Sequence, residues 1–570
     1  MKQVLVRRGS VVVEDVPAPL VGKGNVLVEV AYSLISTGTE LEGVKRSGES
    51  LVRKAVEHPE KVRKLIHHLA EQGIKKTLAM VRSKVDAAQP LGYSCSGVVI
   101  QVGDEVEGIR PGDLVACAGA GKANHAEIVL VPKNLVVKVP EGLSLQDAAS
   151  VALGAIAMQG VRRADPKLGE LVAVIGLGLL GQLTVQLLKI AGCRVIGFDL
   201  QKSRVALAQE LGLDWGFVST ETDPQKEVFN LTGGHGVDAT IITAAAPGNH
   251  AIIRLATEIT RKKGKVVVVG DVGLGLQRSP LYEKELDILI STSYGPGRYD
   301  EVYEEKGIDY PYTYVRWTEK RNMQEYLRLL AEGKLNFRRL VGGVYPIEKA
   351  PEAYRALQEE DERPLAVLLD YHHNESDTAR KLRTKVETLA GSKVKTGPIR
   401  VALVGAGDFA KAVHLPNLQR LSNLYTIRAI VSATGLNAKD TAKKFGAVYC
   451  TTDFRDVLVD EEIDMVIICT RHNLHAKMAI EAAKAGKAIF LEKPMALNQA
   501  ELNELVTVLK DTGVPFTVGF NRRFSPAAVR AKELIGQRTN PLIVVYRVNA
   551  GYIPLDNWVH GEEGGGRIIG

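Results

Sequence analysis

Two long stretches of the chain alternate short apolar runs with segments in which apolar residues recur every three or four positions. The first stretch covers residues 150 to 295, and the second begins at Ile399. The apolar runs are short and rich in Val and Ile, which predicts buried strands, and strands that alternate with helices form a parallel sheet covered on both faces. The pattern predicts an α/β fold with two such units, with strands at 171–175, 194–198, 239–243 and 265–269 in the first and at 399–404, 426–431, 465–469 and 488–491 in the second.

The segments around the first unit have other patterns. Residues 1 to 43 and 97 to 139 contain short β-type runs bounded by glycines, which predicts a β-rich domain. Between them, residues 44 to 89 have apolar positions at helical spacing among Lys and Arg, which predicts a helical insertion. Residues 372 to 398 are polar and end in Thr-Gly-Pro, which predicts an interdomain linker.

Composition limits the class of protein. The chain has 570 residues, 45% of them hydrophobic and 24% charged, which is typical of a folded protein with several domains. The five cysteines include no CxxC pair, which argues against a disulfide framework or a structural zinc cluster. The first residues, Met1 to Val4, show no apolar core of a secretory signal, and we expect a cytoplasmic protein.

The formal charge of +7 is concentrated in two segments. Residues 44 to 89 hold 11 Lys and Arg against 5 Asp and Glu, and residues 371 to 400 hold 7 against 3. The other parts are close to neutral, so no basic groove for nucleic acid is indicated. Two interpretations of residues 44 to 89 remain open: a solvated helical segment, or a surface for nucleic acid or anionic membranes.

Residues 171 to 188 carry no charge and approach the length of a membrane span. Glycines interrupt this stretch at the spacing GxGxxG, formed by Gly176, Gly178 and Gly181, directly after a predicted strand. A strand, a tight turn and a helix explain this spacing better than a span, and the helix N-terminus would bind a dinucleotide pyrophosphate. Leu179, inside the loop, is expected beside the cofactor.

Asp199 closes the next predicted strand, 18 residues past Gly181. A carboxylate there accepts a hydrogen bond from the adenosine ribose 2′-hydroxyl and repels a 2′-phosphate, which predicts NAD at this site. A glycine-rich structural turn is the alternative.

A second loop of this type, GxGxxA, begins at Gly405 and Gly407 between the strand and helix of the second unit. Phe409 and Ala410 complete it and are expected at the cofactor. No carboxylate follows the next strand, so NAD and NADP both remain open, as does a loop that has lost its cofactor; the polar residues available there are Ser432, Thr434 and Lys439.

Residues 1 to about 370 resemble the medium-chain dehydrogenase/reductase family, of the alcohol and sorbitol dehydrogenase type. The resemblance rests on residues 32–40 (YSLISTGTE), 91–99 (LGYSCSGVV), 111–115 (PGDLV), 345–354 (YPIEKAPEAY) and the first glycine-rich loop. It implies a GroES-like β domain over residues 1–150 with the insertion 44–89, a Rossmann domain over 151–295, and a return to the first domain over 296–371.

The zinc ligands of that family are not matched. Ser36-Thr37 stands where zinc members have Cys, and Tyr93-Ser94 stands where they have His-Glu. Hydroxyl groups do not replace thiolate and imidazole as zinc ligands, so we expect no zinc and no other metal. Tyr93 is then a candidate for proton transfer, and a buried structural tyrosine is the alternative.

Residues 294 to 317 hold six tyrosines and one tryptophan together with Arg298 and Arg316. Aromatic faces beside arginines suit a sugar or a sugar-nucleotide phosphate, so Tyr294 and Arg298 are candidate substrate contacts. Aromatic packing between domains is the alternative.

From Ile399 onward the chain resembles the Gfo/Idh/MocA family of sugar and inositol oxidoreductases. The motifs are GAGDFA at 405–410, TRHNLH at 470–475, EKP at 492–494 and VGFNRRF at 518–524. The resemblance implies a Rossmann domain over 399–520 and the start of an α+β substrate-binding sheet over 521–570. It places Lys493 near the nicotinamide and the substrate carbinol, and Arg523 near the substrate, with cofactor contacts from Thr470, Asn473, His475 and Glu492. A surface lysine before a proline turn is the alternative for Lys493.

The same family has a catalytic histidine shortly after a Gly-Gly segment. Gly564 to Gly566 resembles that segment, and residues 542 to 548 resemble a first strand of the substrate sheet. No histidine follows before Gly570, so we expect a truncated sequence whose second module is inactive as it stands.

These features predict a two-module oxidoreductase of carbohydrate metabolism, in which each module moves a hydride between nicotinamide and a small-molecule alcohol or carbonyl, such as a sugar or sugar nucleotide. We expect a homo-oligomer that binds neither nucleic acid nor membranes. The alternative is a dinucleotide sensor or scaffold with one or both modules catalytically silent.

Overall fold

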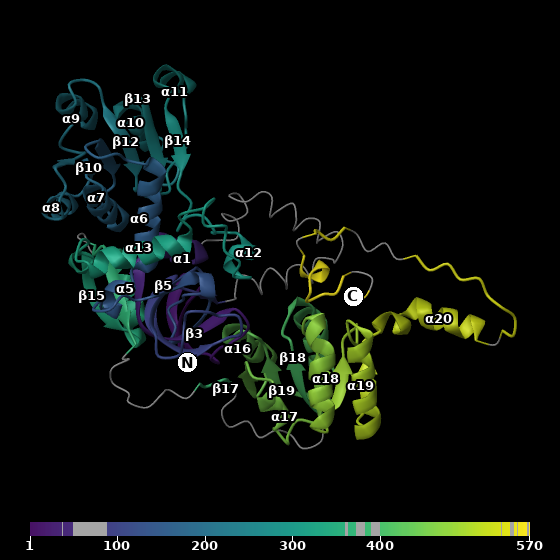
Figure 1. The fold of residues 1–570 in the computed structure, drawn as a ribbon. Helices are drawn as coiled ribbons and strands as arrows, with labels where there is room; N and C mark the ends of the chain where they lie inside the picture. Colours follow the sequence, from purple (N-terminus) through teal and green to yellow (C-terminus); the bar gives the residue numbers. More distant parts are fainter. Residues whose placement is uncertain are drawn as a thin grey trace. The chain divides into compact units, whose positions relative to one another are not determined.

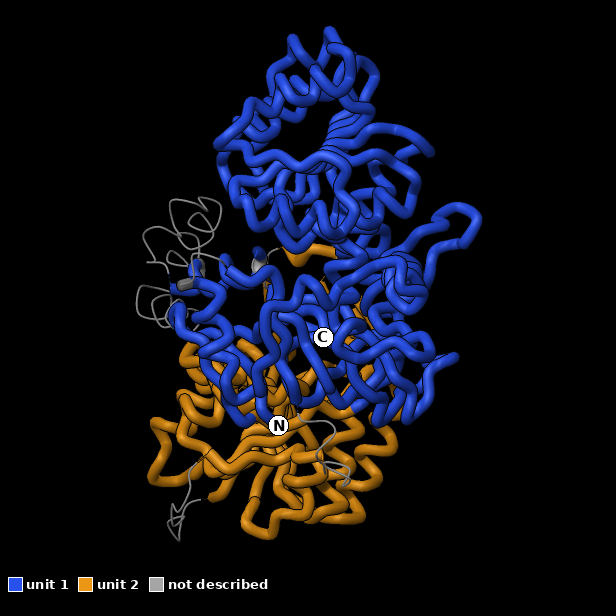
Figure 2. Tube along the Cα trace, turned by 90° about the vertical axis from the view of Figure 1, so that its left-hand side faces the viewer, with its two compact units in different colours: residues 1–15, 21–380 blue, residues 16–20, 381–570 orange. Residues whose placement is uncertain are grey.

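The computed structural model describes residues 1–36, 38–48, 88–359, 363–371, 382–388, 399–536, 538–547, 552–555, 557–566 and 569. It contains two compact units, one formed by residues 1–15 and 21–380 and the other by residues 16–20 and 381–570 (Figure 2). Most of the predicted insertion (49–87), most of the predicted linker and Thr37 lie outside the described residues. No helix among the described residues is long and apolar enough to cross a membrane.

The first unit begins with a β domain, as predicted. A small sheet has the order β2-β1-β4, and a larger one has the order β15-β16-β3-β5-β6-β8 with β7 paired to β3. The strands are β1 (Lys2–Arg7), β2 (Ser10–Asp15), β3 (Asn25–Ser36), β4 (Gln89–Pro90), β5 (Ser94–Val102), β6 (Leu114–Ala118), β7 (Ile128–Pro132), β8 (Val136–Lys138), β15 (Val341–Pro346) and β16 (Ala366–Asp370). Because β16 pairs antiparallel with β3, the chain returns to this domain after the α/β part.

The α/β part of the first unit is a six-stranded parallel sheet of order β11-β10-β9-β12-β13-β14 (Figure 1). The four predicted strands are present, and two short edge strands were not predicted from the sequence. The bounds are β9 (Leu171–Ile175), β10 (Arg194–Asp199), β11 (Trp215–Val218), β12 (Val237–Ile242), β13 (Thr260–Val268) and β14 (Asp287–Ile290).

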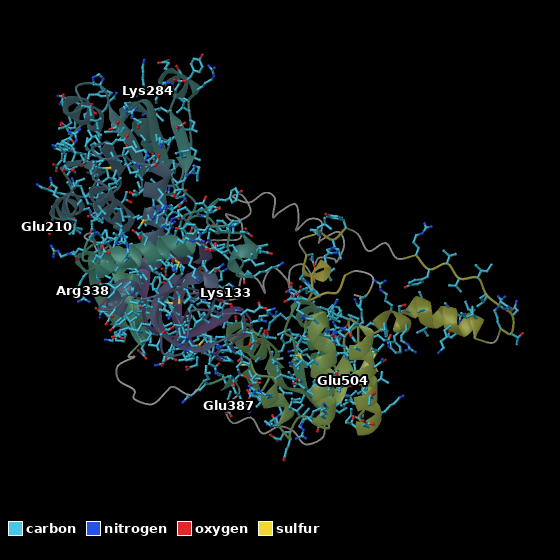
Figure 3. All side chains as sticks on the ribbon, in the orientation of Figure 1. Lys133, Glu210, Lys284, Arg338, Glu387 and Glu504 are labelled. Carbon is cyan, nitrogen blue, oxygen red and sulfur yellow. The ribbon has the colours of Figure 1, made fainter. Side chains whose placement is uncertain are left out.

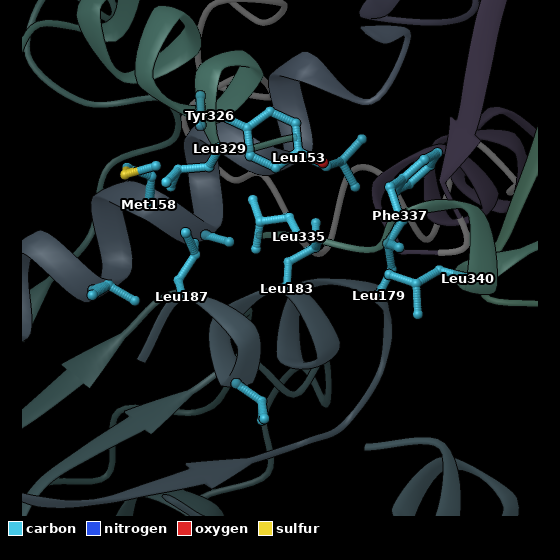
Figure 4. Packing of buried hydrophobic residues seen from close by; sticks show 14 of the residues in the cluster. Leu153, Met158, Leu179, Leu183, Leu187, Tyr326, Leu329, Leu335, Phe337 and Leu340 are labelled. Atoms are coloured by element: carbon cyan, nitrogen blue, oxygen red, sulfur yellow. The ribbon is translucent and has the colours of Figure 1, made fainter. Parts of the chain in front are cut away.

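The helices of this unit are α1 (Thr39–Gly48), α5 (Leu145–Ala148), α6 (Val151–Ala164), α7 (Leu179–Ile190), α8 (Lys202–Glu210), α9 (Pro224–Leu231), α10 (Ala251–Ile259), α11 (Arg278–Lys284), α12 (Glu301–Glu304), α13 (Glu319–Ala331) and α14 (Ala350–Glu359). Figure 4 shows side chains of α6, α7 and α13, among them Leu153, Leu183 and Tyr326, in one buried cluster. A Cβ on Gly154 would lie 2.3 Å from the Tyr326 ring, so α6 and α13 meet closely at a residue without a side chain.

Lys284, labelled in Figure 3, caps the C-terminal end of α10. Its ammonium donates hydrogen bonds to the carbonyl oxygens of Thr257, Glu258 and Thr260, at 3.0, 2.6 and 2.9 Å. A cation at this end satisfies carbonyls that have no partner within the helix and complements the helix dipole.

The second unit is built on a seven-stranded sheet of order β17-β20-β19-β18-β21-β22-β23. All pairs are parallel except the one between β17 and β20. The bounds are β17 (Lys385–Glu387), β18 (Ile399–Val404), β19 (Tyr425–Val431), β20 (Tyr449–Thr451), β21 (Met465–Ile468), β22 (Ala488–Leu491) and β23 (Phe516–Val518). Its helices are α15 (Leu415–Arg420), α16 (Gly435–Phe445), α17 (Arg455–Leu458), α18 (His475–Lys484), α19 (Gln499–Thr512) and α20 (Pro526–Ile535). Figure 1 shows α18 and α19 side by side against this sheet.

Two predictions for this unit were wrong in part. The predicted linker 372–398 is not all linker, because β17 is an edge strand whose residues Lys385 to Glu387 pair with β20. The predicted strand 542–548 is absent in its described part, 542 to 547. No neighbouring strand pairs with these residues, and Ile543 and Val545 are 98% and 84% exposed. A strand without a partner leaves its backbone hydrogen bonds unmade, which removes the reason for it to form.

Residues Val16 to Leu20 belong to the second unit, although they lie between β2 and β3 in the sequence. The Ala18 N–H donates to the Arg383 carbonyl at 2.8 Å, and the Thr452 hydroxyl donates to the Ala18 carbonyl at 2.6 Å. Val16 and Ala18 are fully buried. These two hydrogen bonds attach residues 16–20 to the second unit.

Candidate dinucleotide and substrate sites

The glycine-rich loop of the first unit joins β9 to α7. Gly176 has a φ of +96° and its Cβ would lie 2.7 Å from the backbone of Ala244, and a Cβ on Gly181 would lie 2.0 Å from the Gly176 carbonyl oxygen. The chain's own packing thus requires these two glycines. Gly178 differs, since it is the N-cap of α7 and no protein atom lies within 4 Å of a Cβ built there. The open space faces a helix N-terminus, which fits a pyrophosphate.

Asp199 lies at the end of β10, beside this loop. The carboxylate is buried and accepts hydrogen bonds from the Leu177 N–H at 2.7 Å and the Gln201 N–H at 2.9 Å. The Arg204 guanidinium is 3.8 Å away, and its buried Nε has no hydrogen-bond partner among the described residues. The Asp199 carboxylate next to the unsatisfied Arg204 Nε–H can bind the adenosine ribose hydroxyls. The sequence alone did not point to Arg204.

Leu179, predicted beside the cofactor, has its side chain elsewhere. The side chain lies in the buried cluster that joins α6, α7 and α13. Only the backbone of Leu179, in the first turn of α7, remains available to a ligand. Its side chain therefore packs in the core and does not face a bound cofactor.

We expect Asp199→Ala to weaken NAD binding about tenfold and to narrow the preference for NAD over NADP, because the variant loses a charged acceptor and its repulsion of a 2′-phosphate. Titration of the full chain with each cofactor measures both effects. Asp214→Ala is the matched control, since Asp214 accepts the Val195 N–H at 2.7 Å near the opposite end of β10. An Asp199→Ala protein with unchanged NAD affinity would exclude the ribose contact.

The β domain of the first unit contains a buried group of hydroxyls. The Tyr93 hydroxyl donates to the Ser36 Oγ at 2.9 Å, and both residues are buried. The Ser36 N–H in turn donates to the Glu40 carboxylate at 3.1 Å. Ser36 and Tyr93 are thus hydrogen-bonded to each other. They stand at the positions where zinc-containing members of the medium-chain dehydrogenase/reductase family, which the sequence resembles, have metal ligands.

Glu40 is anchored by groups from distant parts of the same unit. His125 Nε2 lies 2.9 Å from its Oε2, and the Tyr354 hydroxyl donates to that same oxygen. The other nitrogen of His125 lies 2.7 Å from the Ser33 hydroxyl, which contacts the Tyr371 hydroxyl at 2.8 Å. Burial and the nearby Glu40 carboxylate raise the pKa of Tyr354. The network therefore holds Tyr354 as a neutral donor.

The glycine-rich loop of the second unit has the same division of roles. Gly405 has a φ of +94°, and its Cβ would lie 2.6 Å from the carbonyl of Cys469. Gly407 again has no protein atom within 4 Å of its Cβ position. Ala410 is buried, whereas Phe409 is half-exposed and its ring meets the His414 ring edge-on. The space in front of Gly407 fits a second pyrophosphate.

The Glu492-Lys493-Pro494 segment follows β22. Glu492 is buried, and its Oε1 lies 2.8 Å from His414 Nε2. Hydrogen bonds from His414 and Asn521 outweigh burial and lower the pKa of Glu492. Glu492 thus stays ionised, fixes the start of the loop and leaves the exposed Lys493 side chain outside the core.

His475 joins this segment to the loop after β21. Its Nδ1 lies 2.7 Å from the Pro494 carbonyl oxygen, and its Nε2 lies 3.2 Å from the Thr470 carbonyl oxygen. Burial lowers the pKa of His475. Both ring nitrogens face the backbone, so the ring positions the two loops, while Thr470 and Asn473 remain candidates for direct contact with a cofactor.

The C-terminal residues fold over the loop after β21. His472 Nδ1 lies 2.9 Å from the Gly564 carbonyl oxygen, and the Asn473 N–H donates to the Glu563 carbonyl at 3.1 Å. The Trp558 ring meets the His472 ring edge-on at 4.8 Å. The predicted Gly-Gly segment therefore lies next to the loop that carries Thr470 and Asn473.

Comparison with known proteins agrees with this geometry. The Gfo/Idh/MocA family model, described as an oxidoreductase family with an NAD-binding Rossmann fold, matches residues 399–520. A second model, described as a zinc-binding dehydrogenase, matches residues 180–306. D-guloside 3-dehydrogenase of Escherichia coli K12 is 30% identical over 281 residues, which are 48% of this chain and 74% of that protein. The chain belongs to the medium-chain dehydrogenases, joined to a Gfo/Idh/MocA oxidoreductase.

Other relatives match smaller parts or the fold alone. The uncharacterized oxidoreductase YrbE of Bacillus subtilis 168 is 36% identical over 140 residues, and the chain spans only 40% of its length. The crystal structure of galactitol-1-phosphate dehydrogenase from Escherichia coli is 20% identical with a TM-score of 0.51, covering 65% of this chain and all of that one. That likeness shows the fold of the dehydrogenase module.

The predicted substrate contacts differ in their surroundings. In the dehydrogenase module, Tyr294 is buried, and Arg298 forms an ion pair with Glu304 at 2.7 Å and lies over the Tyr299 ring. In the Gfo/Idh/MocA module, Arg523 is exposed beside the Phe524 ring. Arg298 is therefore already neutralised, which makes it a weaker candidate for binding an anionic substrate, and Arg523 remains a prediction.

Glu319, missed in the sequence, is buried at the start of α13. Its two carboxylate oxygens have no hydrogen-bond partner among the described residues. Burial, and then the neighbouring Glu304 carboxylate, raise the pKa of Glu319 from 4.5 to about 9. The acid therefore stays protonated near neutral pH.

This shift makes stability depend on pH. Between about pH 4.5 and 9 the folded protein keeps a proton that the unfolded chain releases, so the free energy of unfolding falls as pH rises. We expect Glu319→Gln to raise the melting temperature at pH 8 and to change it little at pH 5. Glu301→Gln, at an exposed position, is the control. Equal shifts at both pH values would contradict a protonated Glu319.

Proposed function

We propose that the chain is a two-module oxidoreductase in which each module transfers a hydride between a nicotinamide cofactor and an alcohol or carbonyl group of a sugar or sugar nucleotide. The observation that carries the proposal is the pair of open cradles at Gly178 and Gly407, each before a helix and each at the end of a buried parallel strand. In such sheets the ligand binds at the carboxyl ends of the strands.

The residues present fit NAD in the dehydrogenase module. The α7 N-terminus and Gly178 would hold the pyrophosphate, and Asp199 with Arg204 would hold the adenosine ribose. The nicotinamide ring, when bound, accepts or donates the hydride at its C4 carbon. We include D-gulosides in the proposed substrate class because D-guloside 3-dehydrogenase, which is 30% identical to this chain over 281 residues, is named for a reaction on these compounds.

Proton transfer in this module is assigned to Tyr93. In the direction of reduction the Tyr93 hydroxyl gives its proton to the carbonyl oxygen as the hydride reaches the carbonyl carbon, and water then reprotonates the tyrosinate; oxidation follows the same steps in reverse. In the free protein the hydroxyl donates to Ser36 Oγ, 2.9 Å away. Glu40 holds the backbone of Ser36 in place. The Ser36 and Tyr93 side chains offer only hydroxyl groups where a zinc site needs thiolate and imidazole ligands, and this chemistry supports the proposal that the module works without zinc.

In the Gfo/Idh/MocA module Lys493 is proposed as the catalytic residue. The His475 contact with Pro494 and the His414 contact with Glu492 fix the residues on either side of Lys493. An ammonium held in this way would donate a hydrogen bond to the substrate oxygen and stabilise the negative charge that develops there as the hydroxyl proton passes to water.

Tyr93→Phe tests the dehydrogenase proposal. With NAD and a panel of D-gulosides, free aldoses and nucleotide sugars, we expect the chelator-treated protein to keep its turnover and Tyr93→Phe to lower kcat about 100-fold or more, with little change in NAD affinity. Tyr371→Phe, which also loses one buried hydroxyl, is the control and should keep kcat within about threefold.

Two results would contradict this proposal. Loss of turnover on chelation would show that a metal ion is required. Tight cofactor binding without reduction or oxidation of any compound in the panel would instead favour the sensor or scaffold alternative. A homo-oligomeric state and a cytoplasmic location remain predictions from the sequence.

A further inference from the structure

The end of β19 in the Gfo/Idh/MocA module carries donors where the dehydrogenase module carries an acid. Ser432 follows this strand and is partly exposed. Its Oγ accepts a hydrogen bond from the Asn437 side-chain amide at 2.7 Å, so its own hydroxyl proton can point away from the protein. The same amide donates to the Ala406 carbonyl at 3.0 Å, inside the glycine-rich loop. Asn437 therefore ties Ser432 to the cofactor loop.

Lys411 completes this group from the loop's own helix. Its ammonium donates to the Asn437 Oδ1, which is a neutral acceptor, and two further N–H donors of the ammonium remain for other partners. The side chain is half-buried, and burial lowers the pKa of Lys411 despite the opposite effects of the nearby Asp408 and Asp440. Lys444 is a further charged neighbour, and it also lowers this pKa.

The equivalent positions of the two loops carry opposite chemistry. Lys411 directly follows Ala410, and Gln182 directly follows Gly181 at the same place in the first loop. The Gln182 side chain donates to the Leu177 and Arg204 carbonyls at 3.0 and 2.8 Å, beside the Asp199 carboxylate. One site thus pairs an acid with a neutral amide, and the other pairs a hydroxyl with an ammonium.

We propose that Lys411, Ser432 and Asn437 form a subsite for the 2′-phosphate of NADP(H), so that the Gfo/Idh/MocA module takes NADP(H) while the dehydrogenase module takes NAD(H). This inference rests on the proposed function, because it requires that a dinucleotide binds at Gly407. An ammonium and a hydroxyl donor suit a dianionic phosphate, and Ser432 occupies the position at which Asp199 of the dehydrogenase module would repel it. The two modules would then draw on different cofactors, and neither would consume the cofactor of the other.

The test uses the full chain with Gly178→Asp, which closes the first cradle. Titration with NADPH and NADH then reports the second site alone. We expect NADPH to bind about tenfold or more tightly than NADH, and Lys411→Gln, which installs the residue of the first loop, to remove most of that difference by weakening NADPH alone. Lys411→Arg should keep the preference. Lys484→Gln, at an exposed position at the end of α18, is the matched control and should keep it as well.

Other results would overturn the proposal. Equal affinities for NADPH and NADH in the Gly178→Asp background would exclude a 2′-phosphate subsite. Equal weakening of both cofactors by Lys411→Gln would show that Lys411 supports the loop rather than the phosphate. Binding of neither cofactor, with an unchanged melting temperature, would instead reject a dinucleotide site in this module, and the subsite with it.

Discussion

Gly178→Asp is expected to abolish NAD binding in the dehydrogenase module without unfolding the protein. Gly178 is the N-cap of α7 with an extended backbone, φ −67° and ψ −168°, which any residue can adopt. Aspartate is among the preferred N-cap residues, so the helix should keep or gain stability. Its carboxylate, however, would occupy the space of the pyrophosphate and repel it. We expect NAD affinity to fall about 100-fold or more, since charged hydrogen bonds are lost and a like charge is added.

The measurement is a NAD titration alongside thermal unfolding of the same protein. Gly22→Asp is the matched control, because a Cβ on Gly22 also meets no protein atom within 4 Å, outside the cradle. Gly22→Asp should bind NAD normally. If Gly178→Asp also bound NAD normally, the cofactor would not lie at this loop.

In a longer form of the protein that includes the rest of the predicted substrate-binding sheet, Lys493→Met is expected to lower kcat of the Gfo/Idh/MocA module by about 100-fold or more, the usual range for loss of a group that transfers a proton. Methionine keeps most of the side chain's length and removes its charge. Because Glu492 and Pro494 are held by His414 and His475, the loop itself should stay in place. Cofactor affinity should change little, and Lys477→Met, at an exposed position on α18, should leave kcat unchanged.

A second readout of Lys493 does not depend on turnover. Burial lowers the pKa of His472, and the charges of Lys493 and Arg471 lower it further. Titration of His472 by NMR should therefore show a higher pKa in Lys493→Met than in the native chain. Unchanged kcat together with an unchanged His472 titration would remove Lys493 from the site.

Much of the fold follows from local patterns, and the exceptions have a common cause. Strand β9 and residues 401–404 of β18 are short runs of Val, Ile, Leu and Ala, so their apolar sequence alone predicts them. The edge strand β17 consists of Lys385, Val386 and Glu387, and only its pairing with β20 makes it a strand. Residues 542 to 547 show the opposite case, because their sequence is typical of a strand but no other strand pairs with them. Whether these residues form a strand depends on pairing with residues distant in the sequence, and not on their own β-propensity.

The candidate sites show the same limit. The glycines and Asp199 could be predicted because their spacing follows the geometry of one loop and one strand. The contacts of Glu40 could not, because His125 and Tyr354 lie 85 and 314 residues away in the sequence. The sequence could have indicated Lys411. In the second glycine-rich loop Lys411 stands at the position that Gln182 has in the first loop, and the strand after the second loop ends without an acid.

Hydride transfer without a metal ion is the central claim, and isotope transfer tests it most directly. The chelator-treated full chain would be incubated with NAD and a D-guloside or other sugar of the panel carrying deuterium on the carbinol carbon. We predict that one deuterium appears at the nicotinamide C4 carbon, and that the Gly178→Asp protein, tested with NAD in the same way, transfers none. Absence of deuterium in the cofactor from every sugar of the panel, or transfer only after zinc is restored, would contradict this account.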